Sequence, residues 1–228
     1  MFYTSDIHSF IMAMIGDKDR EKLAQIFDGE LKGPVNIVFF TSKSNCEYCD
    51  ETGQLLAELS DISRGMLKVE IHDFDKDRTV SESYGIDKTP AIVMPFGNGN
   101  GVRYYGIPGG YEFTSLIEDI VDVSGGSTKL TSDVRKRVKE ISKKVHIQVF
   151  VTPTCPWCPK AVRTAHQFAM ENDSITSDMV EATEFPELAR SFEVMAVPKI
   201  VINGDVSFEG ALPEETFLDY IRKSIEQP

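Results

Sequence analysis

The four cysteines of the chain form two pairs with the same internal spacing. Cys46 and Cys49 make one C-x-x-C pair, Cys155 and Cys158 make the other, and no cysteine is left over. Such thiols can form structural disulfides, ligate a metal ion or exchange electrons as a dithiol centre. Structural disulfides suit small secreted scaffolds, and this chain has 228 residues. The knuckles of a four-thiolate zinc site lie about 15 to 20 residues apart, whereas 106 positions separate Cys49 from Cys155, so the spacing favours two redox centres.

Each cysteine pair lies between a predicted strand and a predicted amphipathic helix. The apolar, β-branched run 35–42 precedes the first pair and the run 146–154 precedes the second, as is typical of buried strands. Apolar residues then recur at helical spacing: Leu55, Leu56, Leu59 and Ile62 after the first pair, and Ala161, Val162, Ala165, Phe168 and Ala169 after the second. The free N–H groups and the dipole of a helix N-terminus favour a thiolate at the first cysteine of each pair.

The surroundings of the two pairs repeat as well. Pro90 and Pro198 follow their pairs at an offset of 108, and Gly106 matches Gly210 further on. The run SGGST at 124–128 predicts a flexible linker, which divides the chain into units 1–124 and 125–228. In each unit strands alternate with helices and close in a hairpin. The expected class is therefore α/β, with a mixed central sheet flanked by helices in each of two tandem units.

This order of elements resembles the thioredoxin fold. Two such units, each with its own C-x-x-C pair, resemble the glutaredoxin-like protein disulfide oxidoreductases of thermophilic archaea and bacteria over nearly the whole chain. The resemblance implies that Pro90 and Pro198 are cis and lie beside the cysteine pairs. The chain departs from the family pattern where Glu47 replaces a proline, and only Gln148 and Val149 occupy the place of the buried aspartate of thioredoxin.

Thiol–disulfide exchange requires a thiolate that attacks a disulfide sulfur and forms a mixed disulfide. Cys46 and Cys155 stand at the exposed ends of the predicted helices and are expected to attack. Cys49 and Cys158, one turn further along, are expected to resolve the intermediate. The expected client-binding residues lie at the loops before the prolines and at the rims of the sites: Thr89, Pro90, Val197, Pro198, Tyr48 and Trp157. The two aromatic residues among them have packing as an alternative role.

The charges around the two pairs differ. Residues 1–124 hold 11 basic and 21 acidic residues, a net charge of −10, whereas residues 125–228 hold 13 and 15, a net charge of −2. The residues nearest Cys46 are mostly acidic: Glu47, Asp50 and Glu51, with Lys43 as the one base. Lys160 and Arg163 follow Cys155 closely. Because nearby cations favour a thiolate, Cys155 is expected to have the lower thiol pKa and its pair to be the more oxidising.

Composition restricts the partners and the compartment. A net charge of −12 argues against a phosphate-binding surface for nucleic acid. The sequence contains no run of about 18 apolar residues, so no membrane span is predicted. The N-terminus lacks the pattern of a secretory signal. A cytoplasmic protein is expected. Cytosolic disulfides are uncommon outside hyperthermophiles, and the low total of 11 Asn and Gln residues agrees with a thermophilic source.

The leading hypothesis is an enzyme, a thiol–disulfide oxidoreductase that forms, reduces or rearranges the disulfides of protein clients. Its redox-active disulfides require no other cofactor. A second hypothesis is an electron shuttle between a flavin disulfide reductase and a peroxidase. The non-enzyme alternative is a metal-binding scaffold that uses all four cysteines.

Overall fold

Sixteen helices and strands make up the computed structural model, which describes residues 13–97 and 99–226 without the side chains of 99 and 100. The first repeat contains α1 (Asp17–Glu30), β1 (Val35–Thr41), α2 (Cys49–Ile62), β2 (Leu67–Asp73), α3 (Arg78–Ser83), β3 (Ala91–Phe96), β4 (Gly99–Tyr105) and α4 (Glu112–Gly125). The second repeat contains α5 (Ser132–Lys139), β5 (Val145–Val151), α6 (Cys158–Glu171), β6 (Ile175–Glu181), α7 (Pro186–Ser191), β7 (Lys199–Ile202), β8 (Val206–Glu209) and α8 (Glu214–Glu226). The order of elements is therefore the same in both repeats.

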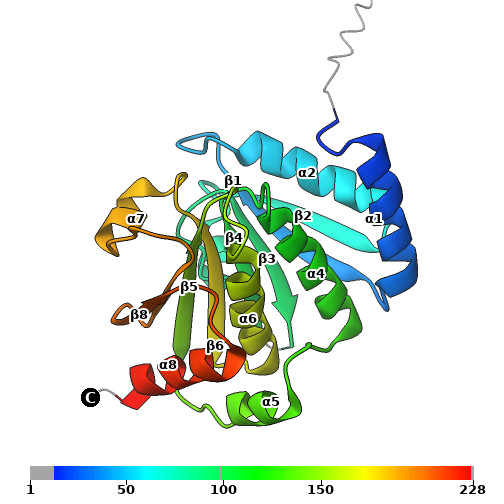
Figure 1. Cartoon of the computed structure of the whole chain (residues 1–228). Coiled ribbons are helices and arrows are strands. Elements are labelled where there is room, and N and C mark those ends of the chain that lie inside the picture. Colours follow the sequence, from blue (N-terminus) through cyan, green and yellow to red (C-terminus); the bar gives the residue numbers. More distant parts are fainter. Residues whose placement is uncertain (1–12, 98, 227–228) are drawn as a thin grey trace, which may run out of the picture.

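The strands of both repeats join into one eight-stranded sheet in the order β2-β1-β3-β4-β6-β5-β7-β8 (Figure 1). In the first repeat, β1 pairs with β2 in parallel and with β3 antiparallel, and β3 and β4 form a hairpin. The second repeat reproduces this pattern with β5, β6, β7 and β8. Parallel pairing of β4 with β6 connects the repeats. The expected α/β class with a mixed sheet is confirmed, and the two sheets are continuous.

The first strand of the first repeat, β1, is apolar on both faces because helices and loops cover the sheet on both sides. Along β1, Ile37 and Phe39 belong to one buried apolar cluster, whereas Val38 and Phe40 belong to another. Successive side chains of a strand point to opposite faces, so the two clusters lie on opposite sides of the sheet. The continuous apolar run in the sequence is thus the signature of a strand buried on both faces.

Buried charges lie where the repeats meet. Arg103 on β4 stands directly opposite Asp178 on β6, with its Nε 2.6 Å from the Asp178 Oδ1. His146 Nε2 lies 2.6 Å from the other Asp178 oxygen. On α4, Asp119 is hydrogen-bonded by Tyr104 and contacts His166 Nδ1 on α6 at 2.6 Å. Buried charges of opposite sign must lie beside each other, because their attraction offsets the free-energy cost of removing them from water. This requirement favours one register of β4 against β6.

The connection between the repeats differs from the expected flexible linker. The helix α4 ends at Gly125, and Gly126 takes a left-handed conformation with φ of 62°. Beyond it, Thr128 hydrogen-bonds Glu171, and the Lys129 N–H donates to Gln167 Oε1 at 2.7 Å. These contacts anchor the connection on α6. The division at residue 124 stays a prediction about domain organisation.

Candidate active sites

The two cysteine pairs occupy equivalent places, each between the end of a strand and the start of a helix. Both pairs are disulfides with Cα atoms 5.5 Å apart. Cys49 is the first residue of α2 and Cys158 the first residue of α6. The short turns that follow β1 and β5 carry Cys46 and Cys155. The four sulfurs therefore form two separate centres at two helix N-termini.

In each pair the first cysteine is the more accessible one. Cys155 is 8% exposed and Cys158 is 0% exposed. Cys46 is half-buried, whereas Cys49 is 3% exposed. The Cys158 N–H donates to Cys155 Sγ at 3.1 Å, so a backbone donor already points at the outer sulfur of the second pair. A hydrogen bond of this kind stabilises a thiolate on that atom.

The prolines that follow the cysteine pairs have the expected geometry. The Thr89–Pro90 and Val197–Pro198 peptide bonds are both cis. In the second repeat the Val197 carbonyl oxygen lies 3.7 Å from Cys155 Sγ, so this loop borders the outer sulfur. The hollow of about 400 Å³ at the first pair is lined by Thr41, Ser42, Lys43, Cys46, Cys49, Asp50 and Asp73, and Thr89 and Pro90 are not among them.

The rims of the two sites differ in polarity. Trp157 beside the second pair is 68% exposed, and Met195, two residues before Val197, is 89% exposed. Sequence reasoning did not single out Met195. Its counterpart in the first repeat is Asp87, which forms an ion pair of 2.5 Å with Lys88. Tyr48 lies at the rim of the first site, and the charge of Glu47 together with burial raises its pKa. The second rim is thus apolar, whereas the first is charged.

Arg163 does not serve the second cysteine pair in the way the sequence predicted. Its side chain is buried against α4, where its Nε lies 3.1 Å from Glu118 Oε2. It also contacts the carboxylates of Asp119 and Asp122. Since these acids compensate the guanidinium charge, Lys160 is the remaining cation of the two that were expected to favour the Cys155 thiolate.

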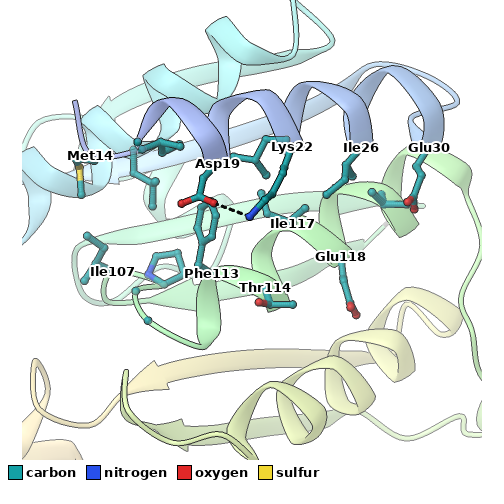
Figure 2. A pocket seen from close by; sticks show the side chains of 18 of the residues that line it. Met14, Asp19, Lys22, Ile26, Glu30, Ile107, Phe113, Thr114, Ile117 and Glu118 are labelled. Atoms are coloured by element: carbon teal, nitrogen blue, oxygen red, sulfur yellow. Dashed lines mark hydrogen bonds and ion pairs between the residues drawn. The ribbon is translucent and has the colours of Figure 1, made fainter.

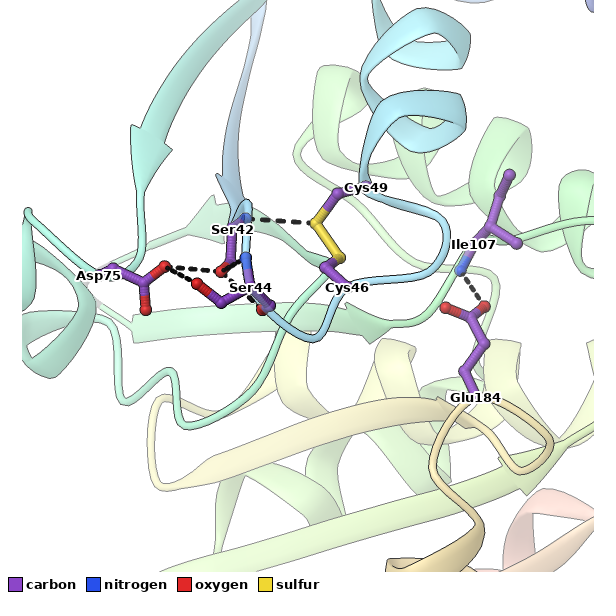
Figure 3. Close-up of a disulfide and its surroundings, with 7 residues drawn as sticks. All are labelled: Ser42, Ser44, Cys46, Cys49, Asp75, Ile107 and Glu184. Carbon is purple, nitrogen blue, oxygen red and sulfur yellow. Dashed lines mark hydrogen bonds between the residues drawn. A yellow bond between two sulfur atoms is a disulfide. The ribbon is translucent and has the colours of Figure 1, made fainter.

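Two carboxyl groups are shielded from solvent close to contacts between the repeats. Glu184 of the second repeat accepts a hydrogen bond from the Ile107 N–H at 2.7 Å, close to the first pair (Figure 3). Glu112 of the first repeat is buried at the start of α4, next to Tyr111, whose N–H donates to Pro153 O at 3.0 Å in the turn before Cys155. Burial raises the pKa of both carboxyl groups to about 7.

Sequence reasoning missed both acids, although one of them left a signal. Glu112 shares the apolar face of α4 with Leu116 and Asp119, at the helical spacing of core positions. An acid on such a face indicates a buried carboxyl group. Glu184 lies in the turn after β6, where acidic residues are common, so its pattern is uninformative.

A larger hollow lies away from the sulfurs. This groove has a volume of about 680 Å³ and lies between α1 and α4, where Ile26, Phe113 and Ile117 form part of its lining (Figure 2). No cysteine lines it. The described residues also contain no cluster of three or more His, Cys, Asp or Glu side chains that could hold a metal ion, and none of their helices has the length and apolar character needed to cross a membrane.

The chain is similar to proteins of known family and known structure. Residues 145–223 match the thioredoxin domain family. A protein disulfide oxidoreductase from Aeropyrum pernix has 33% sequence identity and a TM-score of 0.87, with 93% of this chain and 94% of that chain covered.

The chain belongs to the protein disulfide oxidoreductase family. The expectations of an enzyme, of a thiol–disulfide oxidoreductase and of two thioredoxin-like repeats are thereby confirmed.

Other relatives of this protein disulfide oxidoreductase chain are longer proteins. The alkyl hydroperoxide reductase protein AhpF of Staphylococcus aureus is 30% identical over 184 residues, which are 80% of this chain and 33% of that protein. A structure of AhpF from Enterococcus faecalis has 27% identity and a TM-score of 0.83, with 90% of this chain and 98% of that chain covered. The chain thus spans about a third of the length of the curated relatives it matches.

Proposed function

We propose that the chain exchanges disulfides with protein clients through both cysteine pairs, with Cys155 and Cys46 as the attacking sulfurs. The observation that carries this proposal is the order of exposure within each pair, because the outer sulfur is the one a client can reach. The N–H of Cys158, which points at Cys155 Sγ, supports the same assignment. A helix N-terminus adds a further stabilising field for the thiolate.

In the reducing direction, the Cys155 thiolate attacks a client disulfide. A sulfur–sulfur bond forms between chain and client, and the second client sulfur leaves as a thiolate. The Cys158 thiolate then attacks Cys155 Sγ, which closes the Cys155–Cys158 disulfide and releases the other client sulfur. Two electrons pass from the chain to the client. The oxidising direction uses the same steps in reverse, and Cys46 and Cys49 play the same parts at the first site.

A client segment is proposed to lie along the loop before each cis proline. Val197 and Thr89 would offer backbone groups to an extended segment, as in the addition of a strand. Pro198 and Pro90 have no N–H and so present no competing donor there. Trp157 would contact client side chains at the second site, and Tyr48 at the first.

Serine at both Cys46 and Cys155 tests the proposal. We expect the reduction of insulin by dithiothreitol to lose its catalysis, because neither pair then retains the sulfur that attacks. Serine at Cys49 and Cys158 should instead trap mixed disulfides with clients, visible on non-reducing gels. Catalysis that survives the loss of both outer sulfurs would contradict the mechanism.

A second proposed role is an electron shuttle between a flavoprotein reductase and a peroxidase. It is favoured by the similarity to the alkyl hydroperoxide reductase protein AhpF, and it would place the chain in the cytoplasm, where glutathione and thioredoxin systems keep thiols reduced. Reduction of the chain by NADH in the presence of a flavin disulfide reductase, monitored by thiol titration, distinguishes this role. A chain that accepts electrons only from small thiols does not act as this shuttle.

A further inference from the structure

Glu184 belongs to the second repeat, but its carboxylate is held by the first. The residue lies in the turn between β6 and α7, and its Oε1 accepts the hydrogen bond from Ile107 in the loop between β4 and α4. Gly106, just before Ile107, leaves the room for this contact. A Cβ atom on Gly106 would stand 2.7 Å from Glu184 Oε1 and 2.6 Å from Glu181 Cβ. The backbone of one repeat is therefore fitted closely around the carboxylate of the other.

Carboxylates of the first cysteine site are among the groups that act on Glu184. Burial raises its pKa to about 7, against the opposing effect of the Ile107 hydrogen bond. Three neighbouring carboxylates add to the rise: those of Glu181 on β6, Glu47 between the two cysteines of the first pair, and Glu51 on α2. The charge of Glu184 in turn raises the pKa of Tyr48, the other residue between those cysteines.

The remaining oxygen of this carboxylate is unusual. Glu184 Oε2 is buried without a hydrogen-bond partner in the part of the chain that the structure describes. A carboxylate oxygen that is buried and unpaired carries a large desolvation cost, which falls when the group takes up a proton. The site thus holds a carboxyl group whose charge changes close to neutral pH, near the turn that carries Cys46 (Figure 3).

We propose that Glu184 controls the reactivity of the Cys46 sulfur from across the repeat interface, so that the first redox site is completed by the second repeat. This inference rests on the proposed role of Cys46 as an attacking thiol. The physical basis is the repulsion between two negative charges. An ionised Glu184 opposes formation of the Cys46 thiolate, and a protonated Glu184 does not. Glu184 acts here as a positioning residue, since its effect reaches the client only through the sulfur.

The test measures the ionisation of a single thiol. A full-length variant with serine at positions 49, 155 and 158 retains Cys46 as its only cysteine. The rate at which iodoacetamide alkylates this thiol is measured from pH 5 to pH 10, with and without Glu184→Gln. Glutamine keeps an oxygen that can accept the Ile107 hydrogen bond, so the variant removes the charge and preserves the contact.

We expect Glu184→Gln to lower the pKa of the Cys46 thiol by about half a pH unit, which corresponds to about threefold more thiolate at a pH below the pKa. The change is modest because solvent screens part of the interaction between the two charges. The matched control is Glu187→Gln, which removes an equal charge from the exposed start of α7. It should leave the profile in place. In a variant that retains only Cys155, Glu184→Gln should likewise have no effect.

Superimposed profiles with and without Glu184→Gln would overturn the inference, as would an equal shift from Glu187→Gln. The measurement needs no client and no turnover. If the unaltered chain fails to reduce insulin while the Cys46 profile shifts as expected, the proposed function fails and this inference stands. If insulin is reduced and the profile does not shift, the reverse holds.

Discussion

The two cysteine pairs have the same backbone placement but different surroundings. At the second pair a backbone N–H points at the outer sulfur, and the rim is apolar, with Trp157 and Met195 exposed. At the first pair the rim carries charges, and the carboxylates of Glu47 and Glu184 interact with each other. Repetition of a fold therefore duplicates the position of the sulfurs, whereas the residues around them set two different chemistries.

The two sites differ largely because each is contacted by residues of the other repeat. The loop from Gly106 to Tyr111 touches both sites, since the Gly106 N–H donates to Pro90 O and the Tyr111 N–H donates to Pro153 O. Ile107, between them, holds Glu184. The two cysteine sites are therefore contacted by different residues of the same loop.

The largest expected effect concerns the glycines that stand at equivalent places in the two repeats. Gly106 and Gly210 have φ values of 93° and 90°, and a Cβ meets neighbouring atoms only at Gly106, where Glu181 and Glu184 stand in its way. Gly106→Ala should lower the free energy of unfolding by about 3 to 5 kcal/mol, the combined cost of a strained backbone and overpacking. Gly210→Ala carries the backbone strain alone, about 1 to 2 kcal/mol.

Urea unfolding of both glycine variants measures this difference. A larger loss at Gly106 attributes the excess to the contact between the repeats. Equal losses at the two positions would mean that the first repeat tolerates the extra atom, and that the cross-repeat contact around Glu184 is loose.

Much of the fold was predictable because each element has a local signature. The apolar runs before the cysteines predicted β1 and β5. The dipeptide Asn203–Gly204, which is typical of a two-residue hairpin turn, lies between β7 and β8, and both residues have positive φ. The pairing of β4 with β6 was not predictable, since an edge strand that pairs and one that stays free can have similar sequences. Arg103 and Asp178, 75 positions apart, gave no sign of their pairing.

Residues of the two sites were predictable from the sequence where they lie in or next to a motif that the sequence itself displays. The cysteines closely follow β1 and β5 and the prolines directly precede β3 and β7, so the repeated motif located both, whereas the family resemblance implied that the prolines are cis. Arg163 shows the limit of this reasoning. It follows Cys158 by five positions, yet its side chain points toward α4 and its charge is compensated there. Glu184 shows the opposite case, a residue remote in sequence from the pair it approaches.

A second prediction compares the stability of the chain at different pH values through Glu112. Its folded pKa of about 7 lies above the ordinary value of 4.5, so the folded state binds the proton more tightly than the unfolded state. The stability of the chain should therefore fall as pH rises from 4.5 to 7. Glu112→Gln should remove up to about 3 kcal/mol of this fall, because each tenfold difference in proton affinity between the two states corresponds to about 1.4 kcal/mol.

The readout is the slope of unfolding free energy between pH 5 and pH 8, because a buried glutamine has a cost of its own that does not depend on pH. Glu215→Gln, on the exposed surface of α8, serves as the control and should keep the slope of the unaltered chain. An unchanged slope in Glu112→Gln would show that the Glu112 carboxyl group is ionised throughout this range.

The smallest expected effect concerns the rims. Met195→Ser should raise the KM for a protein client at the second site about threefold, because part of an exposed apolar side chain no longer contacts the client. Asp87→Ser at the equivalent place of the first repeat should raise it less. Reduction of a small disulfide such as glutathione disulfide serves as the control for both. A threefold effect on that small substrate too would place Met195 in the sulfur chemistry and not in client binding.

The pairing of β4 with β6 has a consequence for any attempt to divide the chain. A cut between α4 and α5 that released the halves would leave each with a bare strand edge, and bare edges recruit other strands. One fragment would also keep Arg103 and the other Asp178, each deprived of its counter-charge. We therefore expect isolated halves to aggregate or to reassemble with each other in solution, so that complementation between co-expressed fragments should succeed where either fragment alone is insoluble.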